Sequence, residues 1–324
     1  MTKPRKKRTP ATSLVLPSHA KINLFLDVLR RRPDGYHDIA TLMHEISLAD
    51  TVRLCDAPSG GIRVECDMPG IPSGRENLAY KAASALRRRC SIRRGVRIVL
   101  QKQIPPGAGL GGGSSNAASV LKGLNRLWKL RLGRPELVEL AAGIGSDVPF
   151  FIVGGTALCT GRGEKVRRLS VRGRLNFVLA FPPFGISTAG VYRGLKVAPP
   201  GPDAGEKSDT KSTAAGLRAP PIKGINLTLA KRRTKLSNGK KGSLSFRNAA
   251  EILFNRLEEP AFGLFPEVKK LKSAVARACS GGALLCGSGS AVFGLCRSAR
   301  EAASAARVLR KATGCEVVPA KSRW

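Results

Sequence analysis

The stretch Pro105-Pro-Gly-Ala-Gly-Leu-Gly-Gly-Gly-Ser-Ser-Asn-Ala-Ala118 is the part of the sequence that most restricts the fold. Its five glycines within seven residues let the backbone approach a ligand closely and turn several N–H groups inward. The helix predicted over residues 114–128 adds its N-terminal amides and its dipole. A flexible linker would not be flanked by a strand, predicted over 96–100, and an alanine-rich helix. The stretch therefore predicts an anion-binding loop.

Two common nucleotide loops fit this stretch poorly. Gly107-Ala-Gly-Leu-Gly-Gly112 satisfies the dinucleotide pattern GxGxxG, which is followed by an acidic residue about 20 positions later. Here the first acid is Glu136, beyond a whole helix and a proline, and the N-terminal half lacks regular βαβ alternation. A Walker A loop needs Lys and then Ser or Thr directly after the glycines, and no lysine stands there.

Outward from the loop, the hydrophobic pattern alternates between strand and helix periods. Strands are predicted over 21–29, 51–55, 62–66, 96–100, 175–181 and 316–318, with a Gly-rich strand region over 281–295. Helices are predicted over 77–90, 114–128, 135–143, 248–258, 266–279 and 298–313. Pro33-Asp-Gly35 marks a turn. This mixture predicts an α+β fold in two domains, covering residues 13–172 and 173–324.

Charge is the second distinctive property of the chain. Its 324 residues carry 56 Lys and Arg against 22 Asp and Glu, a net charge of +34, which points first to polyanionic partners. Residues 1–12, with five of the positive charges, are predicted to be a disordered tail, and 198–245 a flexible basic insertion in the second domain. The rest of the chain still carries about +20.

Other classes of protein are excluded by composition. No apolar run approaches the ~18 residues needed to cross a membrane, and the short apolar stretch near the N-terminus is no signal-peptide core. The eight cysteines show no CxxC spacing and sit mostly among apolar neighbours, so we expect reduced core residues in a cytoplasmic protein. The three histidines lack zinc-ligand spacing, and no metal ligand can be identified.

The wider pattern Pro-x2-Gly-Leu-x3-Ser-Ser-x-Ala-Ala, residues 106–118, resembles the ATP loop of the GHMP kinase superfamily. Further motifs narrow the resemblance: Ser18-His-Ala-Lys-Ile-Asn-Leu-Phe-Leu26, Arg32-Pro-Asp-Gly-Tyr-His37, Gly145-Ser-Asp-Val-Pro-Phe150, Gly185-Ile-Ser-Thr-Ala-Gly-Val-Tyr192 and Gly287-Ser-Gly-Ser-Ala-Val-Phe293. Together they look like the kinases of the non-mevalonate isoprenoid pathway that phosphorylate 4-diphosphocytidyl-2-C-methyl-D-erythritol. The resemblance covers residues 14–196 and 247–319. It implies a ribosomal-S5-like N-terminal domain and a ferredoxin-like C-terminal domain, with the active site between them.

The resemblance also implies roles for individual residues. Lys21 and Asp147 would be the catalytic pair, Asp147 taking or orienting the proton of the substrate hydroxyl and Lys21 stabilising the alkoxide. Without the motifs, such a pair would as readily be a structural ion pair. The expected ATP-binding residues are Pro106, Gly107, Gly109, Leu110, Gly111, Gly112, Gly113, Ser114, Ser115 and Asn116.

The acceptor substrate would lie against a second set of residues. Tyr36 is expected to stack on the cytosine, His37 to bind its edge, and Tyr192 to sandwich the base. The remaining expected contacts are Asn23, Met43, Gly287, Ser288 and Gly289. Met43 departs from the family, where phenylalanine is common, so altered affinity is expected. The glycines of 287–289 could also form a plain tight turn.

The implied reactants are ATP, with Mg²⁺ expected and Ser115 a candidate ligand, and the cytidylyl methylerythritol. A homoserine or mevalonate kinase is the nearest alternative, and Asp-Gly-Tyr-His disfavours it because a small acid needs no base-stacking pair. A basic RNA-binding protein is a second alternative, and the scarcity of aromatics (5%) disfavours nucleic acid. A monomer or homodimer is expected, with no membrane partner.

Overall fold

The computed structural model describes residues 13–57, 60–196 and 242–323. The predicted basic tail and most of the predicted insertion over 198–245 lie outside these residues. Within them, no helix is long and apolar enough to cross a membrane.

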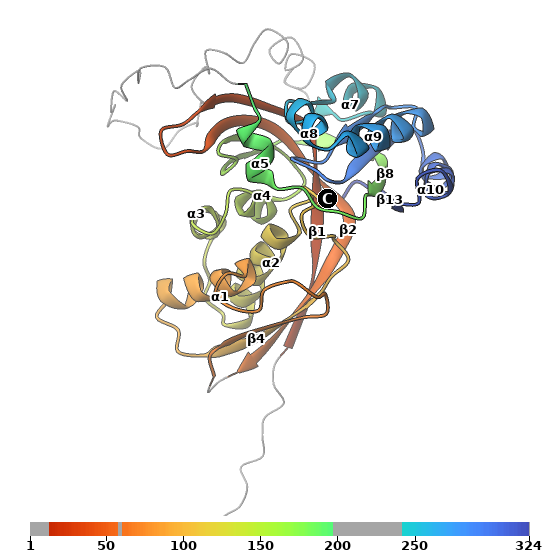
Figure 1. Ribbon diagram of the computed structural model, residues 1–324. Helices are drawn as coiled ribbons and strands as arrows, with labels where there is room; N and C mark the ends of the chain where they lie inside the picture. Colours follow the sequence, from red (N-terminus) through yellow and green to blue (C-terminus); the bar gives the residue numbers. More distant parts are fainter. Residues whose placement is uncertain (1–12, 58–59, 197–241, 324) are drawn as a thin grey trace, which may run out of the picture.

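Two long strands, β1 (Ser13–Arg31) and β2 (His37–Ala57), are central in the larger sheet and run along much of the molecule (Figure 1). They pair antiparallel through the turn that contains Pro33-Asp-Gly35, with register shifts between His19 and Lys21 and between Asn23 and Phe25. Among the described residues the sheet has seven strands in the order β10-β1-β2-β4-β3, with β5 paired to β2 and β6 paired to β5. The added strands are β3 (Ile62–Cys66), β4 (Gly95–Gln101), β5 (Thr156–Gly161), β6 (Lys165–Arg168) and β10 (Phe254–Asn255).

Helices α1 to α4 cover one face of this sheet (Figure 1). They are α1 (Leu78–Arg89), α2 (Gly112–Leu127), α3 (Arg134–Ala142) and α4 (Val148–Val153). α1 begins where Asn77 caps the Ala79 amide, and α2 buries Ala117, Leu121 and Leu124 on one face. A large apolar core between sheet and helices holds α2 in a fixed place.

The second sheet lies in the order β11-β12-β8-β13. Its strands are β8 (Asn176–Phe181), β11 (Ala283–Leu285), β12 (Val292–Cys296) and β13 (Glu316–Lys321). α8 (Glu258–Leu264), α9 (Pro266–Ala278) and α10 (Ala299–Thr313) pack on one face. The other face packs against β1 and β2 in a shared core that includes Ile22, Leu24, Phe177 and Phe293. Short elements complete the chain: α5 (Thr188–Arg193), α7 (Phe246–Ile252), β7 (Val171–Arg172) and β9 (Gly242–Ser243).

Most predicted elements are confirmed, and one is wrong. The single helix predicted over 248–258 is two helices, α7 and α8, with strand β10 between them. β10 pairs in parallel with β1, so a segment from the C-terminal half adds a strand to the larger sheet. The cysteine prediction holds for Cys159, Cys279, Cys286 and Cys296, which are buried, and the other four are half-buried.

Candidate functional site

Lys21 lies where β1 leaves regular pairing. Residues two apart on a strand share a face, so Lys21 and Asn23 point to the same side of β1. The Lys21 ammonium donates to Asn23 Oδ1 and to the Gly109 carbonyl oxygen, each at 2.8 Å, and its Nζ is 3.5 Å from Asp147 Oδ2. The Lys21 side chain is only 5% exposed and Asp147 29%. A nearly enclosed cation therefore faces a carboxylate that remains open to ligand.

The glycine loop is packed directly against Lys21 and against the second sheet. Gly109 has φ +76°, and a Cβ there would lie 1.7 Å from the Cys286 carbonyl oxygen. The Ser290 amide donates to the Gly107 carbonyl at 3.2 Å. Gly111, at φ +71°, precedes α2 and would press a Cβ onto the Phe151 ring. Glycine is required at these positions because both the backbone angles and the space exclude side chains.

A pocket of about 1190 Å³ opens beside Lys21 and Asp147. Its lining contains most of the residues predicted to contact the acceptor substrate: Asn23, Tyr36, His37, Met43, Tyr192, Gly287 and Ser288. Gly289 is not among the lining residues, and a Cβ on it would point toward Leu285 and Ile186. The structure thus brings together residues that lie more than 250 positions apart in the sequence.

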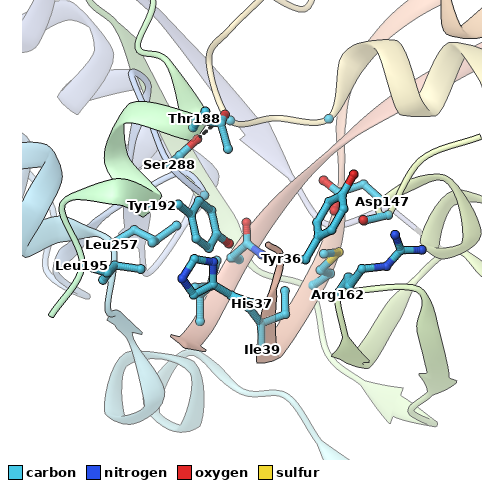
Figure 2. A pocket seen from close by; sticks show the side chains of 18 of the residues that line it. Tyr36, His37, Ile39, Asp147, Arg162, Thr188, Tyr192, Leu195, Leu257 and Ser288 are labelled. Carbon is cyan, nitrogen blue, oxygen red and sulfur yellow. Dashed lines mark hydrogen bonds between the residues drawn. The ribbon is translucent and has the colours of Figure 1, made fainter. Parts of the chain in front are cut away.

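Three aromatic side chains line this pocket, and Figure 2 shows Tyr192 and His37 near one another and Tyr36 on the side of Asp147 and Arg162. His37 and Tyr192 have ring centroids 5.1 Å apart, and the Arg162 guanidinium lies 4.8 Å from the centre of the Tyr36 ring. Tyr36 is 53% exposed, so a ring face is available to a ligand. Partial burial and the nearby Arg31 cation lower the pKa of His37, which keeps the imidazole neutral at pH 7. Burial, and secondarily Asp147, raise the pKa of Tyr192, so its phenol keeps its proton.

The predicted ATP-binding residues differ in how far they are exposed. Gly109 and Gly111 line the pocket, while Pro106, Gly107 and Gly113 are exposed and Gly112 and Ser114 half-buried. Leu110, Ser115 and Asn116 are buried. Asn116 donates to Ser18 Oγ and to Asp50 Oδ2, both at 2.9 Å, and Ser18 donates to Ser115 Oγ. In this structure the buried side chains of Ser115 and Asn116 therefore support the glycine loop through hydrogen bonds to β1 and β2.

Asp50 is the centre of that supporting network. Its Oδ1 accepts from the amides of Gln103 and Ile104, both at 2.8 Å, and its Oδ2 pairs with the buried Lys102 ammonium. These bonds fix the chain immediately before the glycine loop. Sequence reasoning missed this residue, because an aspartate within a strand carries no signal of such distant partners.

Other pocket residues were also missed. Arg31, Arg162 and Arg193 bring positive charge to the lining, Leu257 adds an apolar surface, and Thr188 Oγ1 lies 2.8 Å from Ser288 Oγ. Figure 2 shows Thr188 and Ser288 together at one side of the pocket, across from Arg162. The turn Gly161-Arg-Gly163 was a usable signal, since two glycines expose the arginine between them.

Comparison with known proteins identifies the family to which the chain is similar. Residues 77–155 match the GHMP kinases N terminal domain and residues 239–314 the GHMP kinases C terminal. A 4-diphosphocytidyl-2-C-methyl-D-erythritol kinase of Shouchella clausii is 41% identical over 276 residues, covering 85% of this chain and 83% of the relative. The kinase of the same name from Bacillus subtilis is 40% identical, covering 85% and 86%.

Solved structures extend the comparison to the fold. A crystal structure of 4-(cytidine 5'-diphospho)-2C-methyl-D-erythritol kinase superposes with a TM-score of 0.70 at 34% identity, covering 96% of this chain and 100% of that one. A homoserine kinase from Cytophaga hutchinsonii shares the fold with a TM-score of 0.69 at 17% identity, covering 99% and 97%. The α+β fold predicted from the sequence is therefore confirmed, and the chain belongs to the 4-diphosphocytidyl-2-C-methyl-D-erythritol kinases of the GHMP kinase group.

Proposed function

We propose that this enzyme transfers the γ-phosphoryl group of ATP to the 2-hydroxyl of 4-diphosphocytidyl-2-C-methyl-D-erythritol, giving the 2-phosphate and ADP in the non-mevalonate route to isopentenyl diphosphate. The observation that carries the proposal is that one pocket is lined both by Lys21 and Asp147 and by the aromatic side chains of Tyr36, His37 and Tyr192. A small alcohol would leave these aromatic side chains without a ligand contact.

The chemical step is assigned to Asp147 and Lys21. Phosphoryl transfer needs an oriented hydroxyl, an acceptor for its proton and positive charge near the transferred group. Asp147 takes the proton of the 2-hydroxyl, the oxygen bonds to the γ-phosphorus, and the bond to the β-phosphate oxygen breaks with its electrons leaving on ADP. Lys21 has two N–H groups committed to Asn23 and Gly109, so its third can face the reacting oxygen.

The cytidine end is assigned to the aromatic residues. Tyr36, held by Arg162, offers a ring face for stacking, and neutral His37 can donate to or accept from the edge of the base. Tyr192 would cover the opposite face of the base. The diphosphate that joins base and polyol would meet Arg31, Arg162 and Arg193, which line the same pocket.

ATP is assigned to the glycine loop and to the first turn of α2, where amides and the helix dipole favour phosphate. Mg²⁺ is expected to neutralise the polyphosphate charge. The Ser115 hydroxyl does not fit as its ligand, because it is buried and accepts a hydrogen bond from Ser18. Among the described residues no group of three or more His, Cys, Asp or Glu side chains could hold a metal ion, so the phosphates of ATP would supply most of the Mg²⁺ ligands.

Coupled ADP release with a panel of alcohols tests the proposal. The purified enzyme should turn over the cytidylyl methylerythritol and leave homoserine and mevalonate unphosphorylated. Turnover of only the two small acids would overturn it. Eight cysteines without a disulfide suit a reducing compartment, so we also propose a cytoplasmic enzyme, acting as a monomer or homodimer.

A further inference from the structure

The Gly287 turn lies directly against the candidate catalytic lysine. Gly287 has φ +57°, and a Cβ on it would lie 3.4 Å from Lys21 Nζ and 3.2 Å from the Gly109 carbonyl oxygen. Lys21 itself donates to that same carbonyl. The distance between this turn and β1 therefore determines the space around the Lys21 ammonium.

Asn255 holds the turn from below. Its side chain is 4% exposed, and its Nδ2 donates to the carbonyl oxygens of Leu285, at 3.0 Å, and Gly287, at 2.7 Å. Its Oδ1 accepts from the Leu257 amide at 2.9 Å. Both amide protons and the amide oxygen are thus used, and a buried group so completely bonded is fixed in one orientation.

The segment that carries Asn255 is also fixed to β1. β10 pairs with β1 at Phe254–Phe25 and Asn255–Leu26, and the Arg256 amide donates to the Leu26 carbonyl at 2.9 Å. Glu258 then accepts from the Leu285 amide at 3.0 Å. Asn255 and Glu258 together clamp β11 and its turn to the strand that carries Lys21 and Asn23.

We propose that Asn255 is a positioning residue for the phosphoryl transfer: it sets the Gly287 turn against Lys21, so that the acceptor hydroxyl meets Lys21 and Asp147 in reactive geometry. This inference rests on the proposed function. Asn255 is buried and is not among the residues that line the pocket. It acts through the turn, whose Gly287 and Ser288 line the pocket, while Leu257, next in the same segment, lines it from the side (Figure 2).

Asn255→Asp is the sharpest test, because it keeps the shape but replaces the amide nitrogen, which donates both hydrogen bonds, with an oxygen that repels the two carbonyls. A displacement of the turn by even 1 Å can cost about a hundredfold in rate. We expect kcat to fall about 10- to 100-fold, with both KM values within about threefold of wild type, the pattern of an interaction realised in the transition state. Arg256→Gln is the matched control: its side chain bonds Asp27 at the surface, and kcat should be unchanged.

A second arm measures the turn without turnover. Hydrogen exchange should accelerate in Asn255→Asp at the Gly289 and Ser290 amides, which bond Cys286 and Gly107, while the rest of the second sheet stays protected. Asn255→Ser serves if Asn255→Asp does not fold. Two results would overturn the inference. One is an Asn255 variant that melts at a lower temperature but keeps the wild-type kcat. The other is a variant with lowered kcat whose amides in the Gly287 turn exchange at the wild-type rate. If wild type fails on the cytidylyl substrate, the proposed function fails, and the kinetic arm uses whichever panel alcohol it does phosphorylate.

Discussion

At the scale of single residues, Lys21 is the most tightly held charge in the pocket. It is almost fully enclosed, its two short hydrogen bonds go to neutral oxygens, and the carboxylate it faces is Asp147. Enclosure strengthens its electrostatic effect on a reacting oxygen, because little water screens it. It also makes Lys21 dependent on its partners, since a buried cation without compensation is costly.

Asp147→Asn should abolish most of the activity. The amide keeps the shape of the carboxylate but cannot take the hydroxyl proton, and loss of a positioned base typically costs about 10²–10⁴ in rate. Steady-state kcat from coupled ADP release measures the effect, and ATP affinity by calorimetry should stay close to wild type. Glu65→Gln, which removes a surface charge paired with Arg97, is the control. Near-normal turnover in Asp147→Asn would remove the carboxylate from the mechanism.

Tyr36 should matter for its ring and not for its hydroxyl. Stacking of an aromatic on a base contributes about 1–3 kcal/mol, so Tyr36→Leu should raise KM for the cytidylyl substrate roughly 5- to 100-fold. Tyr36→Phe keeps the ring and its contact with Arg162 and should stay near wild type. KM for ATP serves as the internal reference. Equal KM values in the Leu and Phe variants would show that the base does not stack there.

At the scale of elements, the sequence predicts the helices and strands whose formation depends on neighbouring residues. Asn77 before α1 and Ser298 before α10 cap their helices through side-chain bonds to Ala79 and Glu301, as their residue types suggest. The helix predicted over 248–258 failed because its decisive contacts are distant. Phe254 and Asn255 are drawn into pairing with β1 by partners some 230 residues away.

The candidate site divides in the same way. The glycine loop and the Pro-Asp-Gly turn could be predicted, because their glycines mark backbone conformations that other residues rarely adopt. The roles of Asp50 and Asn255 could not be predicted, because each side chain bonds backbone groups that only folding brings close to it. A single sequence shows which residue types are present and does not show which carbonyl will lie 2.7 Å from an amide.

Gly109→Ala should break the contact between the glycine loop and the turn after β11. The added methyl would meet the Cys286 carbonyl and would require a left-handed backbone, together costing about 2–5 kcal/mol. Urea unfolding should show a clear loss of stability, and any folded enzyme should be nearly inactive. Gly263→Ala is the control, since nothing lies within 4 Å of its added methyl and stability should hold. Equal midpoints in both variants would contradict this packing.

His44 should make stability depend on pH. It joins β5 to the chain end after β13, with ring nitrogens 2.9 Å from Thr156 Oγ1 and Ser322 Oγ, and burial lowers its pKa to about 3. The unfolded chain takes up this proton near pH 6.5 and the folded chain does not, so stability is present above pH 6.5 and is lost as pH falls toward 3. Each pH unit in that window costs about 1.4 kcal/mol.

The test compares urea unfolding of wild type and His44→Gln at pH 7 and pH 5. The stability advantage of wild type should shrink by about 2 kcal/mol between them, because the variant lacks the titrating ring. Thr156→Val removes a partner yet keeps the imidazole, so its pH slope should match that of wild type. Parallel pH slopes in wild type and His44→Gln would assign the acid sensitivity to other groups.

At the scale of the whole molecule, the net charge of +34 divides by location. Arg31, Arg162, Arg193 and Lys21 line the pocket, where a diphosphate-bearing substrate needs cations. Arg87, Arg88 and Arg89 end α1 instead, where they complement the negative end of that helix's dipole. Under the proposed function, positive charge therefore serves nucleotide binding in one place and ordinary helix stability in another, and it does not require a nucleic-acid partner.

The two sheets should unfold as one unit. Their shared core buries Ile22 and Leu24 of β1 against Phe177 of β8 and Phe293 of β12, all with essentially no exposure. Exposing each such side chain costs about 1.5–3 kcal/mol, which is a large share of the stability of a typical domain. The larger sheet would also lose β10, and His44 would lose Ser322. Neither half can keep this core dry by itself.

The full chain should therefore melt in a single calorimetric transition, with the calorimetric and van't Hoff enthalpies equal. A fragment of residues 13–172 should show no cooperative transition and should bind a hydrophobic dye. Mixing it with a fragment of residues 173–324 during refolding should restore the transition, because the missing half of the core returns. Two resolved transitions in the full chain, or cooperative melting of the first fragment alone, would show two independently stable domains. In that case the pocket between the sheets would depend on docking of preformed halves, and Lys21 and the Gly287 turn would meet only after each half had folded.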